Sequence, residues 1–277
     1  MRMRIVMLAL LLASSPAWAI FTNGGFETGN FTGWTFTIGT NPGLSGSPPF
    51  TGASVVIASG GSNTSAVVGA GQDPRAPQLT LPRAGSFTAR VNDFNNGAII
   101  NSIKQSAPIT SADIDPADGQ LHVRFSYAAV LEDPGHAPQQ QPYFFVRLRD
   151  LTKGTVLYED FTYSGQPGKT FTTTVWSGTG TPWNSNTQFQ NTDIVVPMSA
   201  LNDTLEIETL GADCSLGGHG GYVYLDGFGS AVVPPSGPAA PAPVGTGTDI
   251  PTLSEWALIL LSMLLAALGM QAYRRRS

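Results

Sequence analysis

The feature that most constrains the fold is the alternation of apolar and polar side chains in short runs of the sequence. Leucine, valine, phenylalanine and tyrosine occupy the odd-numbered positions of residues 121–127, whereas His122 and Arg124 occupy even-numbered ones. Successive side chains of a β-strand point to opposite faces of its sheet. The alternation therefore predicts a strand at residues 121–130.

The same kind of run recurs throughout residues 20–233. Gly, Pro, Ser, Thr and Asn separate segments rich in Val, Ile, Phe, Tyr and Thr, as is typical of strands joined by turns, and helical periodicity is nearly absent. The other predicted strands cover residues 34–39, 53–58, 86–91, 98–105, 143–150, 155–163, 170–176, 193–197, 204–210 and 222–233. Many short, half-buried strands predict an all-β domain of two antiparallel sheets, packed as a β-sandwich or jelly roll.

The amino-terminal residues have the three parts of a secretory signal peptide. Arg2 and Arg4 precede an apolar run at residues 5–13, and an Ala-x-Ala site ends at Ala19. An apolar run of this length is too short to span a membrane. We therefore predict a signal peptide at residues 1–19 and an exported chain that begins at Ile20.

The carboxyl terminus carries a second apolar segment, with aromatic and basic flanks. Residues 257–270 contain no charge, and Trp256 and Tyr273 stand at the two edges. A span of 256–273 is near the lower limit of the roughly 17–25 residues that cross a bilayer as a helix. Aromatic rings favour the headgroup zone and positive charge stays cytoplasmic, so we predict a transmembrane helix with a cytoplasmic end. A Pro-, Ala- and Gly-rich linker, residues 234–249, separates this tail from the body.

The tail begins with Ile-Pro-Thr-Leu-Ser-Glu-Trp and ends with three arginines. This order resembles the IPTL-CTERM sorting signal, one of a wider group that includes PEP-CTERM signals on exported proteins of Gram-negative bacteria. The resemblance implies an inner-membrane intermediate, recognition by an exosortase-type sorting enzyme and delivery to the cell surface or the medium. A plain membrane anchor is the alternative. The predicted sorting-signal residues are Ile250, Pro251, Thr252, Leu253, Ser254, Glu255, Trp256, Arg274, Arg275 and Arg276.

Two short motifs stand at opposite ends of the body. Residues 23–27 read Asn-Gly-Gly-Phe-Glu and are followed by Gly-Trp, and residues 222–226 read Tyr-Val-Tyr-Leu-Asp. They resemble the opening and closing strands of galactose-binding-like jelly rolls, a group that contains many carbohydrate-binding modules. The resemblance implies that Glu27 and Asp226 hold a structural calcium ion together with backbone carbonyls. The alternative is two solvated carboxylates, because calcium needs six to eight oxygen ligands and the sequence offers two.

Aromatic side chains supply the candidate ligand-binding residues. Trp176 and Trp183 flank a short loop, and Tyr222 and Tyr224 share a strand face with Asp226. Rings that pack against sugar faces, beside polar groups that bind hydroxyls, predict a surface for polysaccharide. The alternative is that these rings fill the interior of the sandwich, as most large aromatic residues do.

Other groups with chemical potential are less specific. His136, Cys214 and His219 could bind zinc if the fold brings them together, although their spacing matches no closed zinc motif. Cys214 is the only cysteine, so no internal disulfide can form. The acid pairs at residues 132–133 and 159–160 point to opposite faces of a strand, so neither pair can supply the two cooperating acids of a glycosidase.

Net charge restricts the class of partner. Residues 20–248 carry 17 acidic and 9 basic side chains, a net charge near −8. This charge disfavours nucleic acid and anionic membrane surfaces as partners. We therefore expect an exported, surface-sorted and non-catalytic protein that binds glycan or associates with the extracellular matrix. A secreted polysaccharide hydrolase and a purely structural surface protein are the alternatives.

Overall fold

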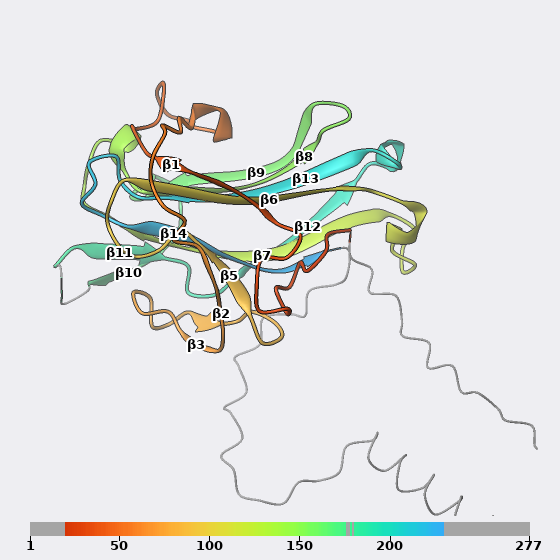
Figure 1. Ribbon diagram of the computed structural model, residues 1–277, viewed down its shortest axis with the longest axis horizontal. Helices are drawn as coiled ribbons and strands as arrows, with labels where there is room; N and C mark the ends of the chain where they lie inside the picture. The colour runs from red at the N-terminus through yellow and green to blue at the C-terminus, as the bar shows by residue number, and fades with distance from the viewer. Residues whose placement is uncertain (1–19, 176–177, 179, 230–277) are drawn as a thin grey trace, which may run out of the picture. The chain divides into compact units, whose positions relative to one another are not determined.

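The structure is a computed structural model that describes residues 20–175, 178 and 180–229 (Figure 1). The predicted signal peptide, the linker, the sorting tail and Trp176 lie outside these residues. In the described part of the chain, no helix is long and apolar enough to cross a membrane.

Two antiparallel sheets form the body, as the strand pattern predicts (Figure 1). The first sheet contains, in spatial order, β1 (Thr35–Thr40), β6 (Ile99–Pro108), β13 (Thr204–Ala212), β8 (Tyr143–Asp150) and β9 (Thr155–Tyr163). The second contains β10 (Thr172–Val175), β11 (Pro182–Ser185), β7 (Leu121–Glu132), β14 (Gly221–Gly229), β5 (Thr88–Val91) and β2 (Ala66–Val68). Strand β12 (Gln190–Val196) also pairs with β7, and β3 (Gly71–Gln72) pairs with β4 (Thr80–Leu81).

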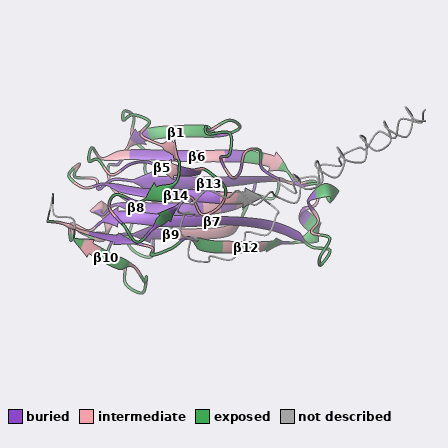
Figure 2. Ribbon diagram, turned by 90° about the horizontal axis from the view of Figure 1, so that it is seen from below, coloured by how far each residue is buried: buried purple, intermediate pink, exposed green. Residues whose placement is uncertain are grey.

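The main core lies between the two sheets. Strand β7 contributes Leu121, Val123 and Phe125 from the second sheet, and β8 contributes Val146 and Leu148 from the first. Figure 2 shows the central strands largely buried and the edge strand β1 largely exposed. The inward-facing residues predicted from alternation in β7 are confirmed.

A smaller cluster covers part of the outer face of each sheet. On the first sheet, Tyr143 and Phe145 pack with Leu44 and Phe50, which come from the long connection after β1. On the second sheet, alanine and valine side chains on the outer face of β7 pack with Leu79, from the connection between β3 and β4. The outer face of β7 is therefore buried as well. The His and Arg residues on that face had suggested that it would be exposed to solvent.

Charged side chains form a ladder on the outer face of the first sheet. Glu206 of β13 lies opposite Arg149 of β8, and Glu208 lies opposite Arg147. Both pairs form salt bridges, with 2.7 Å between Arg147 Nη2 and Glu208 Oε2. Glu159 of β9 lies 3.7 Å from the other side of the Arg147 guanidinium. These charges therefore link three adjacent strands.

Two predicted strands are wrong. Residues 53–58 form no strand: Gly52–Ser54 is a 3-10 turn, which Thr51 caps by accepting a hydrogen bond from the Ala53 N–H, and only Ala58 bridges to β1. The opening motif at residues 23–27 forms turns. Phe26 has a φ of 58°, which lies in the left-handed region and outside the β region, although its side chain is buried in the main core as expected.

Candidate functional site

A pocket of about 210 Å³ lies between the two sheets, where β9 of the first sheet approaches β7 and the connection from β11 to β12. Two adjacent loops complete it, one after β9 and one after β11. The lining residues are Tyr127, Phe144, Asp160, Thr162, Lys169, Thr170, Phe171, Asn186 and Gln190. The pocket thus combines aromatic rings with a carboxylate, an ammonium group and two amides.

Asp160 is the centre of the hydrogen bonds in this pocket. The Tyr127 hydroxyl donates to its carboxylate at 2.6 Å, Lys169 Nζ donates at 2.6 Å and the Thr162 hydroxyl donates at 3.0 Å. Burial, and then the negative charge of Asp160, raise the pKa of Tyr127 far above its ordinary value. The Tyr127 hydroxyl therefore keeps its proton and stays a hydrogen-bond donor.

The rim of the pocket is more exposed than its base. Lys169, Thr170 and Gln190 are exposed, whereas Tyr127 and Phe144 are buried. The side chains at the rim can therefore meet a ligand in solvent, while those at the base hold the rim in place.

None of these pocket residues was predicted as a site residue. The sequence did contain one signal for this site, an acidic residue on the inward face of a strand. Asp160 lies on the same side of β9 as Tyr158, which packs against the main core. Sequence alone did not show that the loops after β9 and β11 converge on it.

The predicted pair Glu27 and Asp226 converge on one loop. Glu27 accepts hydrogen bonds from the backbone N–H groups of Ser86 and Phe87, at 3.0 and 3.2 Å. Asp226 accepts from the N–H of Arg83 at 2.7 Å. Burial raises the pKa of Asp226 to about 7, and the charge of Glu27 adds to this rise, while backbone hydrogen bonds oppose it. Both carboxylates thus have protein donors, and calcium at this position stays a prediction.

Three of the four predicted ligand-binding aromatics are interior residues. Trp183 and Tyr224 are 1% exposed and Tyr222 is fully buried. Both tyrosine hydroxyls donate to the buried Asp73 carboxylate, and Tyr224 does so at 2.6 Å. The guanidinium of Arg75 lies 5.6 Å from the Trp183 ring. Buried rings offer no face to a ligand, so this placement corrects the predicted surface at these three residues and agrees with the interior alternative.

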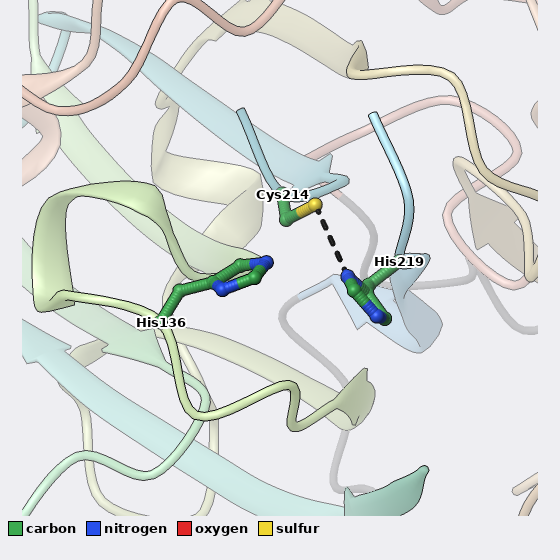
Figure 3. Close-up of side chains that lie close together, drawn as sticks. All are labelled: His136, Cys214 and His219. Carbon is green, nitrogen blue, oxygen red and sulfur yellow. Dashed lines mark hydrogen bonds between the residues drawn. The ribbon is translucent and has the colours of Figure 1, made fainter. Parts of the chain in front are cut away.

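The fold brings together the three residues that were named as a possible zinc site. His136 lies between β7 and β8, whereas Cys214 and His219 lie between β13 and β14, and the three side chains meet (Figure 3). One ligand atom from each lies within 4.8 Å of the other two.

A second group of titratable side chains lies at the start of β7. His122 contacts Asp193 Oδ1 at 2.6 Å through Nδ1 and Asp118 Oδ2 at 3.0 Å through Nε2. Arg124 bonds Asp115 at 2.7 Å and Asp193 at 2.9 Å. Burial alone would lower the pKa of His122, but the hydrogen bonds to the two carboxylates outweigh it and raise that pKa. These groups satisfy one another as ion pairs.

Comparison with protein-family models matches residues 250–276 to the IPTL-CTERM motif. The resemblance predicted for the tail is thereby confirmed, and the motif implies an exported, surface-sorted protein. The match covers the tail alone and assigns no family to the body. No curated protein matches the chain.

Solved structures with similar folds have little sequence in common with this chain. A mannohexaose complex of the module CBM27-1 from Caldicellulosiruptor saccharolyticus is 11% identical, with a TM-score of 0.36, over 74% of this chain and 93% of that one. The K2 adhesin domain of Lys-gingipain is 13% identical, with a TM-score of 0.34, over 74% and 94%. The carbohydrate-binding module CBM28, which is specific for non-crystalline cellulose, is 12% identical, with a TM-score of 0.33, over 75% and 92%. At these scores the likeness carries no argument about the site.

Proposed function

We propose that this chain is exported, that its IPTL-CTERM tail directs it to the cell surface, and that its body is a non-catalytic jelly roll that binds polysaccharide in the Tyr127–Asp160 pocket. The delivery part rests on the tail motif at residues 250–276. A signal peptide, a transmembrane intermediate and an exosortase-type enzyme complete the route that we propose. The tail would place the body outside the cell, where polysaccharide is an abundant partner.

The path of the chain supports the jelly-roll assignment. From β5 onward the chain passes repeatedly between the two sheets: β5 and β7 belong to the second, whereas β6 and β8 belong to the first. All strand pairs in both sheets are antiparallel, including the central pair of β7 and β14. Strands that alternate between two antiparallel sheets are the arrangement of jelly rolls.

The observation that carries the binding proposal is the composition of the pocket. Phe171 provides a half-buried ring beside the polar groups of Lys169, Asn186 and Gln190. A sugar has apolar C–H faces and a rim of hydroxyls, so it needs both kinds of group. The volume of about 210 Å³ is below the roughly 300–1,000 Å³ of pockets for drug-sized ligands, and it suits one sugar unit or a chain end.

The carboxylate pairs do not favour hydrolysis. Asp160 faces Tyr127 inside the sandwich, whereas its neighbour Glu159 accepts a hydrogen bond from the Gly52 N–H on the opposite side of β9. The two acids cannot flank one glycosidic bond, because that chemistry needs both carboxyl groups on the same substrate. We therefore prefer binding to turnover.

A glycan array beside a reducing-sugar release assay tests the proposal on the full-length chain in detergent. We expect binding without sugar release, and we expect Phe171→Ala and Lys169→Met to weaken that binding. Glu159→Gln is the matched control, because Glu159 lies on β9 outside the pocket and its substitution should leave binding unchanged.

The other outcomes distinguish the alternatives. Release of reducing sugar would identify a hydrolase. A chain that binds no glycan while reaching the surface would be a structural surface protein. Binding that survives both pocket substitutions would place the site elsewhere.

A further inference from the structure

We propose that His136, Cys214 and His219 bind one zinc ion on the body of this protein. This site is separate from the Tyr127–Asp160 pocket and does not depend on the proposed glycan binding. Two of the three residues, Cys214 and His219, lie on the loop between β13 and β14.

The backbone of this loop places Cys214 and His219 face to face. The Cys214 N–H donates to the His219 carbonyl at 2.9 Å, and the Gly217 N–H donates to the Cys214 carbonyl at 3.1 Å. These bonds close a tight loop, in which Gly217 has a φ of 76° that favours glycine. The result is a distance of 3.5 Å between Cys214 Sγ and His219 Nδ1.

His136 comes from a different loop and completes the group. Its ring lies at a steep angle of 72° to the ring of His219, with 5.1 Å between the centroids. Figure 3 shows the imidazole of His136 turned toward the other two side chains. The two loops are joined directly, because the Ser215 N–H donates to the Gln140 carbonyl at 3.2 Å.

Further hydrogen bonds hold this arrangement before any ion binds. The Glu132 carboxylate accepts from the Gly220 N–H at 3.1 Å. The Asp213 carboxylate accepts from the Ile99 N–H at 2.9 Å. Both acids are buried. Glu132 is the last residue of β7 and Asp213 directly follows β13, so each acid stands where one of the two loops begins. A metal site needs such outer support to fix the orientation of its ligands.

The spacing of the three ligand atoms fits a tetrahedral ion. Zinc bonds of about 2.0–2.1 Å to nitrogen and about 2.3 Å to sulfur place neighbouring ligand atoms roughly 3.3–3.7 Å apart. The Cys214–His219 pair is already at that separation, and all three atoms lie within 4.8 Å of one another. Small rotations of the side chains would therefore bring His136 to the required distance.

An orphaned nitrogen provides an independent indication of a ligand. His136 Nε2 is buried and has no hydrogen-bond partner among the described residues. Leaving a buried polar atom without a partner costs about 1–3 kcal/mol. A zinc ion bound at the His136 ring would remove this cost, whereas a simple thiol–imidazole hydrogen bond between Cys214 and His219 leaves it in place.

The donor types indicate the class of metal. A thiolate and two imidazoles suit borderline-soft ions such as zinc, whereas magnesium and calcium take oxygen ligands. The group formed by the described residues offers three side chains, which leaves one position of a tetrahedron for water or an external group. Cys214 is fully buried while both histidines are partly exposed, so an ion can enter from the histidine side.

The test uses the tag-free, full-length chain in detergent. Elemental analysis of the protein as isolated should find about one zinc ion per chain. After the zinc is removed, Co²⁺ should produce a thiolate-to-cobalt absorption band, and zinc should abolish that band and raise the melting temperature. His136→Gln, His219→Gln and Cys214→Ser should each weaken zinc binding by at least ~10-fold, the loss that follows removal of even an outer-shell partner.

His122→Gln is the matched control, since the chain has three histidines and His122 is the one outside the group. This variant should retain zinc. Because Cys214 is buried, Cys214→Ser could destabilise the fold, so alkylation gives a second readout: zinc should protect Cys214 from alkylation in the unmodified chain, and His136→Gln should abolish the protection. A chain that takes up no zinc, a His136→Gln chain that binds zinc normally, or copper in place of zinc in the isolated protein would overturn the proposal.

Discussion

The hydroxyl of Tyr127, on β7 of the second sheet, donates a 2.6 Å hydrogen bond to the carboxylate of Asp160, on β9 of the first sheet. This bond crosses the interior of the sandwich at the base of the pocket. Hydrogen bonds to charged groups contribute about 1.5–3 kcal/mol to stability, more than those between neutral groups.

Tyr127→Phe should therefore lower the free energy of unfolding by about 1–3 kcal/mol, because Asp160 loses one donor but keeps Lys169 and Thr162. Tyr143→Phe is the matched control, because the buried Tyr143 hydroxyl has no partner among the described residues. Its removal should be neutral or stabilising. Denaturant unfolding of both variants checks the prediction, and an equal loss in the two would contradict it.

The His122 cluster should make stability depend on pH. Asp193 and Asp118 stabilise the protonated ring, so the pKa of His122 is raised from 6.5 in the folded state. The stabilisation is complete below about pH 6.5 and is lost as the pH rises through the folded-state pKa. Asp115 and Arg124 also face this cluster and stay charged throughout this range.

Denaturant unfolding across this pH range, on the chain and on His122→Gln, measures the effect. Asp213 and Asp226, whose pKa values burial raises to about 7, titrate in the same range. The readout is therefore the difference in the free energy of unfolding between the unmodified chain and His122→Gln at each pH. That difference should shrink as the pH rises above 6.5, and a constant difference would show that His122 does not titrate as predicted.

Calcium at Glu27 and Asp226 is testable by chelation. If an ion joins the two carboxylates, it stabilises the folded state by about 2.7 kcal/mol when its concentration is 100 times the dissociation constant. Chelation should then lower the melting temperature, calcium should restore it, and Glu27→Gln or Asp226→Asn should abolish the response. An unchanged melting temperature in the presence of the chelator would mean that the backbone N–H groups of residues 83–87 hold these acids without an ion.

Trp183→Ala should unfold the body more readily and should not weaken glycan binding selectively. The ring is 1% exposed, and truncating a buried tryptophan costs about 3–5 kcal/mol. Thermal unfolding checks the cost. Trp176→Ala is the informative companion, because Trp176 remains a predicted ligand-binding residue outside the described part of the chain. A loss of binding without a loss of stability would confirm it.

The sorting tail predicts a processing defect. Deleting Arg274, Arg275 and Arg276, or replacing Pro251 and Glu255, should leave the protein unprocessed in the inner membrane, because each change breaks one part of the matched motif. Cell fractionation and the mass of the surface-exposed protein measure the outcome. Normal delivery at the normal mass in these variants would favour a plain anchor.

Alternation of side chains predicted most of the sheets because it reports burial directly. β8 and β9 begin and end at the predicted residues, and β7 extends two residues beyond its predicted end. The strands β2, β3, β4 and β11 were not predicted, and the first three of these have only two or three residues, which is too few to show a period.

The candidate sites were harder to predict, because they depend on which loops meet. Motif spacing gave little support to His136, Cys214 and His219, since the two loops that contain them are far apart in sequence. The aromatic prediction at Tyr222 and Tyr224 failed for a related reason. Alternation placed them on the same strand face as Asp226, but it could not show that the connection from β3 to β4 covers that face and places Asp73 beneath their hydroxyls.

The ladder of Glu206, Glu208, Arg147 and Arg149 also selects one way of assembling the first sheet. A slip of two residues between β8 and β13 would keep every apolar side chain on its proper face, so hydrophobic burial alone cannot reject it. In the native register both glutamates meet an arginine. A two-residue slip in either direction would keep one such pair and set the remaining Glu and Arg beside uncharged residues. The ion pairs therefore favour the native register of β8 and β13 over a two-residue slip during folding, whatever they add to the stability of the folded protein.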